Sequence, residues 1–106
     1  MIAKDMRSRF AENVYAALKK VPKGNVTTYK ELAKAVRSKA YRAVGTAMRT
    51  NSDISRIHCY RVIRSDGSIG EYSAPGGTSR KAALLKADGI EIRNGRIDLR
   101  YIYRFR

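Results

Sequence analysis

The sequence predicts a mainly α-helical fold with small β-hairpins, organised around a helix-turn-helix. Apolar residues recur at helical spacing in several segments, and Gly, Pro and Asn separate these segments. Two of the helical segments are short and adjacent, which is typical of a helix-turn-helix. With 106 residues and a hydrophobic content of 43%, the chain can build one core but not two. We therefore expect a single domain over residues 1–106.

An amphipathic helix is expected near the N-terminus, capped by Asp5 or Ser8. Its apolar residues recur three and four positions apart, so one face should pack against the core. Pro22 and Gly24 should end it, because neither residue continues helical geometry well. The apolar positions are Phe10, Val14, Ala17, Leu18 and Val21.

The helix-turn-helix is expected between Thr28 and Met48. Thr28 and Glu31 have the spacing of a capping box, in which a hydroxyl and a carboxylate bond the free amides at a helix start. The helical pattern pauses over residues 37–40, and a second helix should begin at about Tyr41. This second helix is rich in Ala and Gly, which permits close approach to a partner such as the DNA backbone. An ordinary helical hairpin is the equally weighted alternative.

Short strands and turns are expected after residue 50. Val62 and Ile63 form a short apolar strand, and residues 65–68 carry a turn signal that suggests a small hairpin. Residues 70–77 contain too many glycines for regular structure. This composition favours a pocket wall and a mobile connector about equally.

A last helix should begin at Thr78 or Ser79 and end at Gly89. The Asn-Gly pair at residues 94–95 lies between alternating apolar residues, which is a strong hairpin signal. The tail, residues 101–106, alternates aromatic or apolar residues with arginines. Two interpretations of this tail stay open: an edge strand, or a contact with nucleic acid.

The charge of the chain indicates a polyanionic partner. Twenty-three Lys and Arg residues against nine Asp and Glu give a formal net charge of +14. Nucleic acid is the commonest partner of a domain this basic, and a generic basic surface is the alternative. Charge alone does not distinguish DNA from RNA.

The single cysteine, Cys59, follows the single histidine, His58, and lies between Arg56 and Arg61. A thiolate is the strongest protein nucleophile near neutral pH, and neighbouring cations favour it. A buried cysteine that acts as a small hydrophobe is the alternative. One Cys and one His cannot form the usual zinc site, so we expect neither a metal nor another cofactor. A lone cysteine fits a reducing compartment and no segment resembles a membrane span, so we expect a cytoplasmic, intracellular protein.

Separate short motifs occur in a fixed order from about Phe10 to Gly89. They are Val26-Thr27-Thr28-Tyr29, Arg42-Ala43-Val44-Gly45 with Ala47-Met48-Arg49 and Asn51, Cys59 with Arg61-Val62-Ile63, Gly67 with Ile69-Gly70 and Tyr72-Ser73, Gly76-Gly77, and Lys81 with Leu84-Leu85 before Asp88-Gly89. Together these motifs resemble the O6-alkylguanine-DNA alkyltransferases and their catalytically silent relatives, the alkyltransferase-like proteins. The resemblance implies the family's C-terminal DNA-binding and active-site domain, with a winged-helix-like helix-turn-helix. The separate N-terminal domain common in the family is expected to be absent.

The resemblance also implies a function in DNA repair. Family members bind duplex DNA through the minor groove, rotate the damaged guanine out of the stack and move its alkyl group irreversibly to a cysteine. We expect such a protein to be a monomer and to act once per molecule. By position, the resemblance implies three sets of residues. The catalytic residues are Cys59, Tyr60, Asp88, His58 and Asn51. The DNA contacts are Tyr29, Arg42, Arg49 and Arg61, of which Arg42 would fill the space that the rotated guanine leaves, and the alkylguanine pocket is formed by Tyr72, Ser73 and Lys81.

Two positions depart from the family pattern. Its usual Pro-Cys-His-Arg is His58-Cys59-Tyr60-Arg61 here, and Asp88 stands in place of a glutamate. A phenol is a poor base near pH 7, since its reference pKa is about 10. Tyr60 could pass a proton toward Asp88, His58 could act as the base, or the thiol could be sluggish. In the last case the protein would be a non-catalytic sensor that flags alkylated DNA for another pathway. Retention of the cysteine favours transfer, because the silent relatives lack it and commonly have Trp there.

Overall fold

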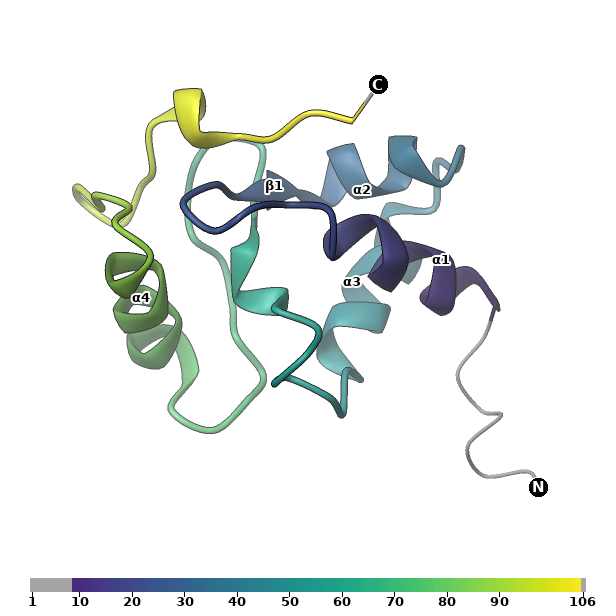
Figure 1. The fold of residues 1–106 in the computed structure, drawn as a ribbon, viewed down its shortest axis with the longest axis horizontal. Helices are drawn as coiled ribbons and strands as arrows, with labels where there is room; N and C mark the ends of the chain where they lie inside the picture. Colours follow the sequence, from purple (N-terminus) through teal and green to yellow (C-terminus); the bar gives the residue numbers. More distant parts are fainter. Residues whose placement is uncertain (1–8, 106) are drawn as a thin grey trace.

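The structure, a computed structural model, describes residues 9–105 (Figure 1). It is mainly helical, as the sequence predicts. No helix among these residues is long and apolar enough to cross a membrane. The elements in chain order are α1 (Arg9–Leu18), β1 (Thr27–Thr28), α2 (Tyr29–Ala35), α3 (Tyr41–Arg49), the 3₁₀ helix η2 (Cys59–Arg61), β2 (Val62–Ile63), α4 (Gly77–Ala87) and the 3₁₀ helix η3 (Leu99–Tyr101).

Helices α1, α2 and α3 pack together around one hydrophobic core (Figure 1). The predicted core-facing side of α1 is confirmed, and a polar contact adds to it: the Tyr15 hydroxyl donates to the Ala47 carbonyl of α3 at 2.6 Å. The predicted caps, Asp5 and Ser8, lie outside the described residues. The buried residues of α1 are Ala11, Val14, Tyr15, Ala17 and Leu18.

The helix-turn-helix is confirmed as α2, a five-residue junction and α3. Thr28 caps α2 as predicted, because its hydroxyl accepts a hydrogen bond from the Glu31 amide at 2.9 Å. Among the described residues, the reciprocal half of the predicted capping box, in which the Glu31 carboxylate bonds the Thr28 amide, is not formed. The Glu31 side chain has a different partner, which the sequence did not indicate. Its carboxylate accepts a hydrogen bond at 3.0 Å from Arg104 in the tail, so the C-terminal segment is tied to the first helix of the motif.

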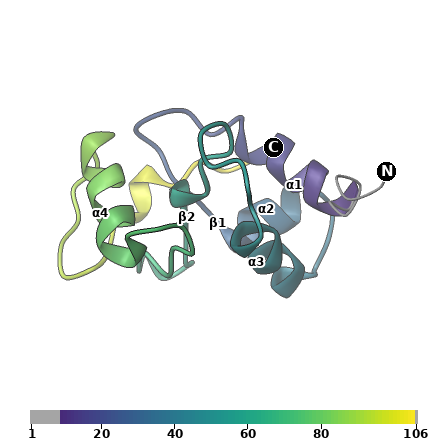
Figure 2. The same cartoon turned by 90° about the horizontal axis from the view of Figure 1, so that it is seen from below.

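Strands β1 and β2 come from distant parts of the chain and run parallel, with Thr27 opposite Val62. This differs from the predicted hairpin of residues 62–69, in which the chain after the turn at 65–68 would pair with Val62 and Ile63; Ser68 instead forms a bridge with Arg96. The predicted hairpin at Asn94-Gly95 is formed, with one antiparallel bridge between Arg93 and Arg96. The parallel pair is buried on both sides between two cores, whereas the hairpin residues alternate with exposed positions. Figure 2 shows β1 and β2 between α4 at one end of the molecule and α1 at the other.

The first part of the tail extends this sheet, as the edge-strand interpretation expects. The Val26 amide donates to the Tyr101 carbonyl at 3.0 Å, and the Tyr103 amide donates back to Val26 at 2.6 Å. Tyr103 and Phe105 then pack against the core of the first three helices. The tail therefore contributes backbone pairing and apolar surface to the fold.

Helix α4 ends as predicted but begins differently. Its N-cap is Gly76, and neither Thr78 nor Ser79 caps it, which corrects the prediction. Gly76 has a φ of +97°, and a Cβ there would lie 2.6 Å from the Cβ of Arg80. Because only glycine fits this backbone and this space, the chain enters α4 without a side-chain cap. At the other end, Gly89 has a φ of +89° and closes the helix.

Candidate active site

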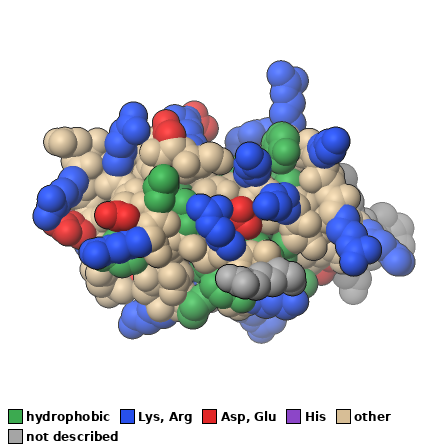
Figure 3. Space-filling model, turned by 90° about the horizontal axis from the view of Figure 1, so that it is seen from above, with side chains coloured by type: hydrophobic (Ala, Val, Ile, Leu, Met, Phe, Trp, Pro, Cys, Tyr) green, Lys and Arg blue, Asp and Glu red, His purple; other side chains and the backbone are tan. Residues whose placement is uncertain are grey.

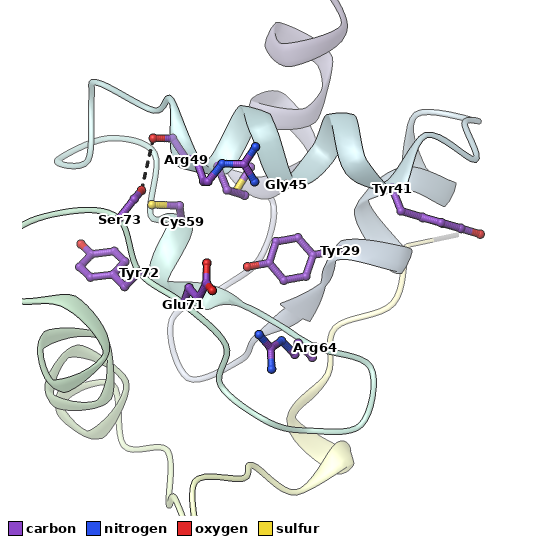
Figure 4. A pocket seen from close by; sticks show the side chains of 10 residues that line it. Tyr29, Tyr41, Gly45, Arg49, Cys59, Arg64, Glu71, Tyr72 and Ser73 are labelled. Carbon is purple, nitrogen blue, oxygen red and sulfur yellow. Dashed lines mark hydrogen bonds between the residues drawn. The ribbon is translucent and has the colours of Figure 1, made fainter.

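A pocket of about 280 Å³ lies between α3, the start of α2 and the 70–77 loop (Figure 4). The Cys59 side chain faces it and is 7% exposed. The Ser73 hydroxyl donates to the Arg49 carbonyl at 3.3 Å, which joins the loop to the end of α3. Five residues expected from the sequence meet here: Tyr29, Arg49, Cys59, Tyr72 and Ser73. Five further lining residues were not expected: Tyr41, Gly45, Met48, Arg64 and Glu71.

The turn that presents Cys59 sits where two hydrophobic cores meet. Cys59 packs with the first three helices, whereas Tyr60 packs with α4. Asn51 holds the backbone that leads into this turn. Its amide donates to the Ile57 carbonyl at 2.8 Å, and its side-chain oxygen accepts from the Asp53 amide at 2.9 Å. A side chain, not regular secondary structure, thus fixes the approach to the thiol.

Asp88 at the end of α4 joins the two residues that follow the cysteine. The Tyr60 hydroxyl donates to Asp88 Oδ2 at 2.9 Å, and Arg61 Nε donates to the same oxygen at 3.2 Å. Arg61 also donates to the Val21 carbonyl at 3.2 Å. The side chains of Arg61 and Asp88 are 11% and 7% exposed. The predicted DNA contact of Arg61 is therefore replaced by a buried ion pair that anchors η2 to α4.

Burial raises the pKa of Tyr60 above its ordinary value of 10.0, and the hydrogen bond to Asp88 raises it further, while nearby Arg61 lowers it. The hydroxyl therefore stays protonated near neutral pH. Because Asp88 accepts its proton in a hydrogen bond, Tyr60 is a donor in this arrangement. It positions the turn, and its bond to Asp88 is the outer half of the bridge by which Tyr60 could pass a proton toward that carboxylate.

Lys81 lies behind the pocket wall and does not line the pocket, although it was predicted as a pocket residue. It is fully buried, and its ammonium donates to the Val62 carbonyl at 2.7 Å and to the Glu71 carbonyl at 3.0 Å. These bonds connect the strand that follows Cys59 to the loop that carries Tyr72. Burial lowers the pKa of Lys81 to about 8.

The pocket combines hydroxyl donors with positive charge. Burial raises the pKa of Tyr29 and of Tyr72, so both phenols stay protonated and can donate hydrogen bonds. Arg49 and Arg64 contribute cations and Glu71 contributes one carboxylate to the lining (Figure 4). This combination suits a polar aromatic ring attached to an anionic backbone.

Two predicted site residues lie outside the pocket lining. The His58 ring nitrogen Nε2 lies 3.2 Å from the Ser55 carbonyl, and His58 borders a different hollow that it shares with Tyr60 and Tyr72. The geometry thus gives no support to His58 as the base for Cys59. Arg42 is exposed near the start of α3, as a residue that reaches a partner must be.

For some of the lining residues that were not expected, the sequence contains information on their position near the pocket, and for others it does not. Gly45 and Met48 lie on the same short helix as Arg49, and Gly45 is one turn before it, so a helical projection places them near the site. Arg64 and Glu71 lie in irregular segments on either side of a turn. Nothing in their local sequence indicates which way their side chains point.

The surface is basic over a wide area. On the face shown in Figure 3, Lys and Arg side chains occur across the surface and outnumber acidic ones. Within residues 9–105, no group of three or more His, Cys, Asp and Glu side chains is placed to hold a metal ion.

The chain matches the family model described as "6-O-methylguanine DNA methyltransferase, DNA binding domain" over residues 9–90. It is 50% identical over 93 residues to a bifunctional methyltransferase/endonuclease of Picrophilus torridus, which covers 87% of this chain and 30% of that protein. It is 49% identical over 78 residues to the methylated-DNA–protein-cysteine methyltransferase of Rattus norvegicus, covering 73% of this chain and 37% of that one. The chain thus spans about a third of the length of these relatives.

The chain also resembles solved structures of alkyltransferase-related proteins in fold. The S. pombe protein Atl1, in complex with damaged DNA containing O6-carboxymethylguanine, superposes with a TM-score of 0.81 at 30% identity, covering 91% of this chain and 95% of that one. The O6-methylguanine-DNA methyltransferase of Pyrococcus kodakaraensis superposes with a TM-score of 0.70 at 42% identity, covering 78% and 47%.

Proposed function

This chain belongs to the O6-methylguanine DNA methyltransferase family, and from that premise we propose that it repairs O6-alkylguanine in duplex DNA by moving the alkyl group to Cys59. One observation carries the proposal: the thiol faces a pocket walled by hydroxyl donors, next to the second helix of a helix-turn-helix. Relatives named as cysteine methyltransferases share most of this domain.

The proposed step is a displacement at carbon. Cys59 Sγ attacks the alkyl carbon, the new S–C bond forms, and the bond between that carbon and guanine O6 breaks. The electron pair of the broken bond stays on the guanine, which takes up a proton and becomes ordinary guanine. The thiol proton leaves for solvent. Because the thioether is stable, each molecule reacts once.

Positive charge around the pocket is proposed to assist the attack of Cys59. His58 borders another hollow and is not placed as the base. Tyr60 donates to Asp88, so it would pass a proton only as a bridge toward that carboxylate. Arg49 and Arg64 line the pocket with Cys59. Nearby cations favour the charged form of a thiol. Lys81 adds to this field while it holds the strand and loop on either side of the site.

Binding is proposed to use the helix-turn-helix and base rotation. Arg42, exposed on α3, would fill the space that the rotated guanine leaves, since a planar guanidinium stacks well on bases. Tyr29 would contact the DNA backbone at the pocket entrance, and Tyr72 and Ser73 would form hydrogen bonds with the rotated guanine. An alkylated guanine pairs weakly, so it costs less to extrude than an intact one.

A damage sensor without transfer is the second candidate. The superposition on Atl1 bound to damaged DNA covers 95% of that chain, so the two domains agree over nearly their whole length. The free thiol of Cys59 favours transfer over sensing, because a sensor needs no nucleophile.

The intact mass of the protein, measured after incubation with a duplex that contains O6-methylguanine, separates the two. We expect a gain of one methyl group on the peptide that bears Cys59, and none with an unmodified duplex. Cys59→Ser should keep its preference for the lesion and gain no mass. Tight binding of the wild-type protein to the lesion with no mass gain would assign the chain to the sensors.

A further inference from the structure

The segment after the family match carries a cluster of arginines that the proposed pocket chemistry does not use. The family model ends at residue 90, and residues 91–106 contain five arginines against two acidic residues. Three of these arginines, Arg93, Arg96 and Arg100, border one shallow hollow of about 320 Å³. We call these three residues the arginine cluster.

The arginine cluster sits on a fixed platform. Arg93 and Arg96 exchange two backbone hydrogen bonds of 2.9 Å across a turn, and Asn94 in this turn has a positive φ of 52°. The next residue, Ile97, is buried, and its amide donates to the Gly67 carbonyl at 2.8 Å. Arg93 and Arg96 are thus held on a hairpin that is bonded to the body of the protein, and Arg100 lies just after it in η3.

Each guanidinium has one local partner and further free donor capacity. Arg93 bonds Glu91 at 2.7 Å, Arg96 bonds the Asp66 carbonyl at 3.3 Å, and Arg100 bonds the Tyr101 hydroxyl at 3.3 Å. A guanidinium has five N–H donors, so most remain for a ligand. Glu91 and Asp98 also border the hollow, but the Asp98 carboxylate is occupied by the amide of Arg100 at 2.9 Å. The Asp66 carboxylate also interacts with Arg96 and with Arg64. Counting Arg64, four cations therefore face three carboxylates, and the balance stays positive.

The cluster is joined to the pocket through a single turn. Arg64 lines the pocket and begins the turn of residues 64–68, in which its amide bonds the Ser68 carbonyl at 3.0 Å. Ser68 forms a bridge with Arg96, and Arg96 bonds Asp66 in the same turn. Positive side chains thus continue from the pocket, over this turn, to the C-terminal hairpin.

We propose that the arginine cluster is a second DNA contact, which binds backbone phosphates of the duplex that flanks the lesion. Planar guanidiniums presented by this hairpin and by η3 match phosphate oxygens in geometry and charge. Phosphates are the same in every sequence, so this contact adds affinity without selecting the lesion. The identity of the partner as DNA rests on the proposed function.

The test compares two variants with the same reduction in charge. R93Q/R96Q/R100Q removes the cluster, and K19Q/K20Q/K23Q removes three exposed lysines of the segment between α1 and β1. Dissociation constants for an unmodified duplex and for one with O6-methylguanine are measured by fluorescence anisotropy over a series of KCl concentrations. Thermal unfolding checks that both variants are folded.

We expect the cluster variant to bind both duplexes more weakly by the same factor. The slope of log K against log salt should become shallower by about 0.9 for each phosphate that the variant no longer neutralises. An unchanged slope, or a slope equal to that of the lysine variant, would overturn the proposal. These slopes are read on unmodified DNA, whereas failure of the proposed function would appear as no lesion preference and no methylated Cys59 in the wild-type protein.

Discussion

The three-helix region (α1 to α3) and the site region (residues 51–77) are held together by different interactions. In the three-helix region, apolar side chains at helical spacing bury one continuous core. In the site region, only β2 and η2 are regular, and single polar side chains hold the rest. Three side chains hydrogen-bond groups in other segments: Asn51 bonds the Ile57 carbonyl, Asp88 bonds the Tyr60 hydroxyl, and Lys81 bonds the Val62 carbonyl. The turn that carries the Cys59 thiol therefore depends on a few polar bonds as well as on the apolar contacts of Cys59 and Tyr60.

This difference has a physical consequence for mutations. The effect of trimming one apolar side chain in a helix core is shared among many neighbours, whereas removal of a buried polar partner leaves a specific group without a bond. We therefore expect the site region to have fewer positions that matter, and we expect changes at those positions to disturb the geometry around Cys59 as well as stability.

The largest expected effect is at Asp88. Asp88→Ala leaves the buried Arg61 without its counter-charge and the Tyr60 hydroxyl without an acceptor. We expect the free energy of unfolding to fall by about 3–5 kcal/mol, measured by urea denaturation. Asp53→Ala is the matched control, because its partner Arg56 is 80% exposed; it should cost less than about 1 kcal/mol. Similar decreases in both variants would show that the Asp88 network contributes no more than a surface ion pair.

The next effect is a dependence on pH, from Lys81. Its pKa is about 8 in the folded protein and 10.5 for an ordinary lysine, so between these values the unfolded chain binds more protons. The free energy of unfolding should therefore rise with pH in this window. Relative to Lys81→Met, the wild-type protein should gain about 2 kcal/mol between pH 8 and pH 10. Urea denaturation at both pH values measures this, and parallel pH profiles of the two proteins would contradict a depressed pKa.

The difference between local helical packing and bonds between distant segments also explains which elements the sequence could predict. Periodicity predicted α1, the helix-turn-helix and the Thr28 cap, because these depend on residues within one or two turns of each other. The start of α4 at Gly76 was missed, since the cap is a backbone conformation and not a side-chain bond. The parallel pairing of β1 and β2 was missed too, because two-residue strands have no readable alternation.

Predictions of the site divide in the same way. The resemblance implied Cys59 as the acceptor, Tyr72 as a pocket residue and Tyr29 as a DNA contact, and the structure brings all three to one pocket. They did not indicate that Arg61 turns inward or that Lys81 lies behind the wall. Burial of a charged side chain depends on partners distant in sequence, such as Asp88 for Arg61, and a local pattern does not contain that information.

The smallest expected effect on stability comes from the loss of single hydrogen bonds. A pair of such variants, one in each region, should differ in methyl transfer and not in stability. Tyr15→Phe removes a hydroxyl bond between α1 and α3, and Asn51→Ala removes the bonds that hold the backbone before Cys59. Each change should lower the free energy of unfolding by about 1–2 kcal/mol. Tyr15→Phe removes the hydroxyl donor of the Ala47 carbonyl. Asn51→Ala leaves the Asp53 amide without its acceptor and removes one of the two donors of the Ile57 carbonyl, the other being the Cys59 amide. Only Asn51→Ala should slow methyl transfer from an O6-methylguanine duplex, by about tenfold or more, since a small displacement of a nucleophile is costly. Transfer rates are measured by mass under conditions in which both variants stay folded. Equal rates in the two variants would mean that the turn holds Cys59 without Asn51, and that the core contacts of η2 are sufficient to position the thiol.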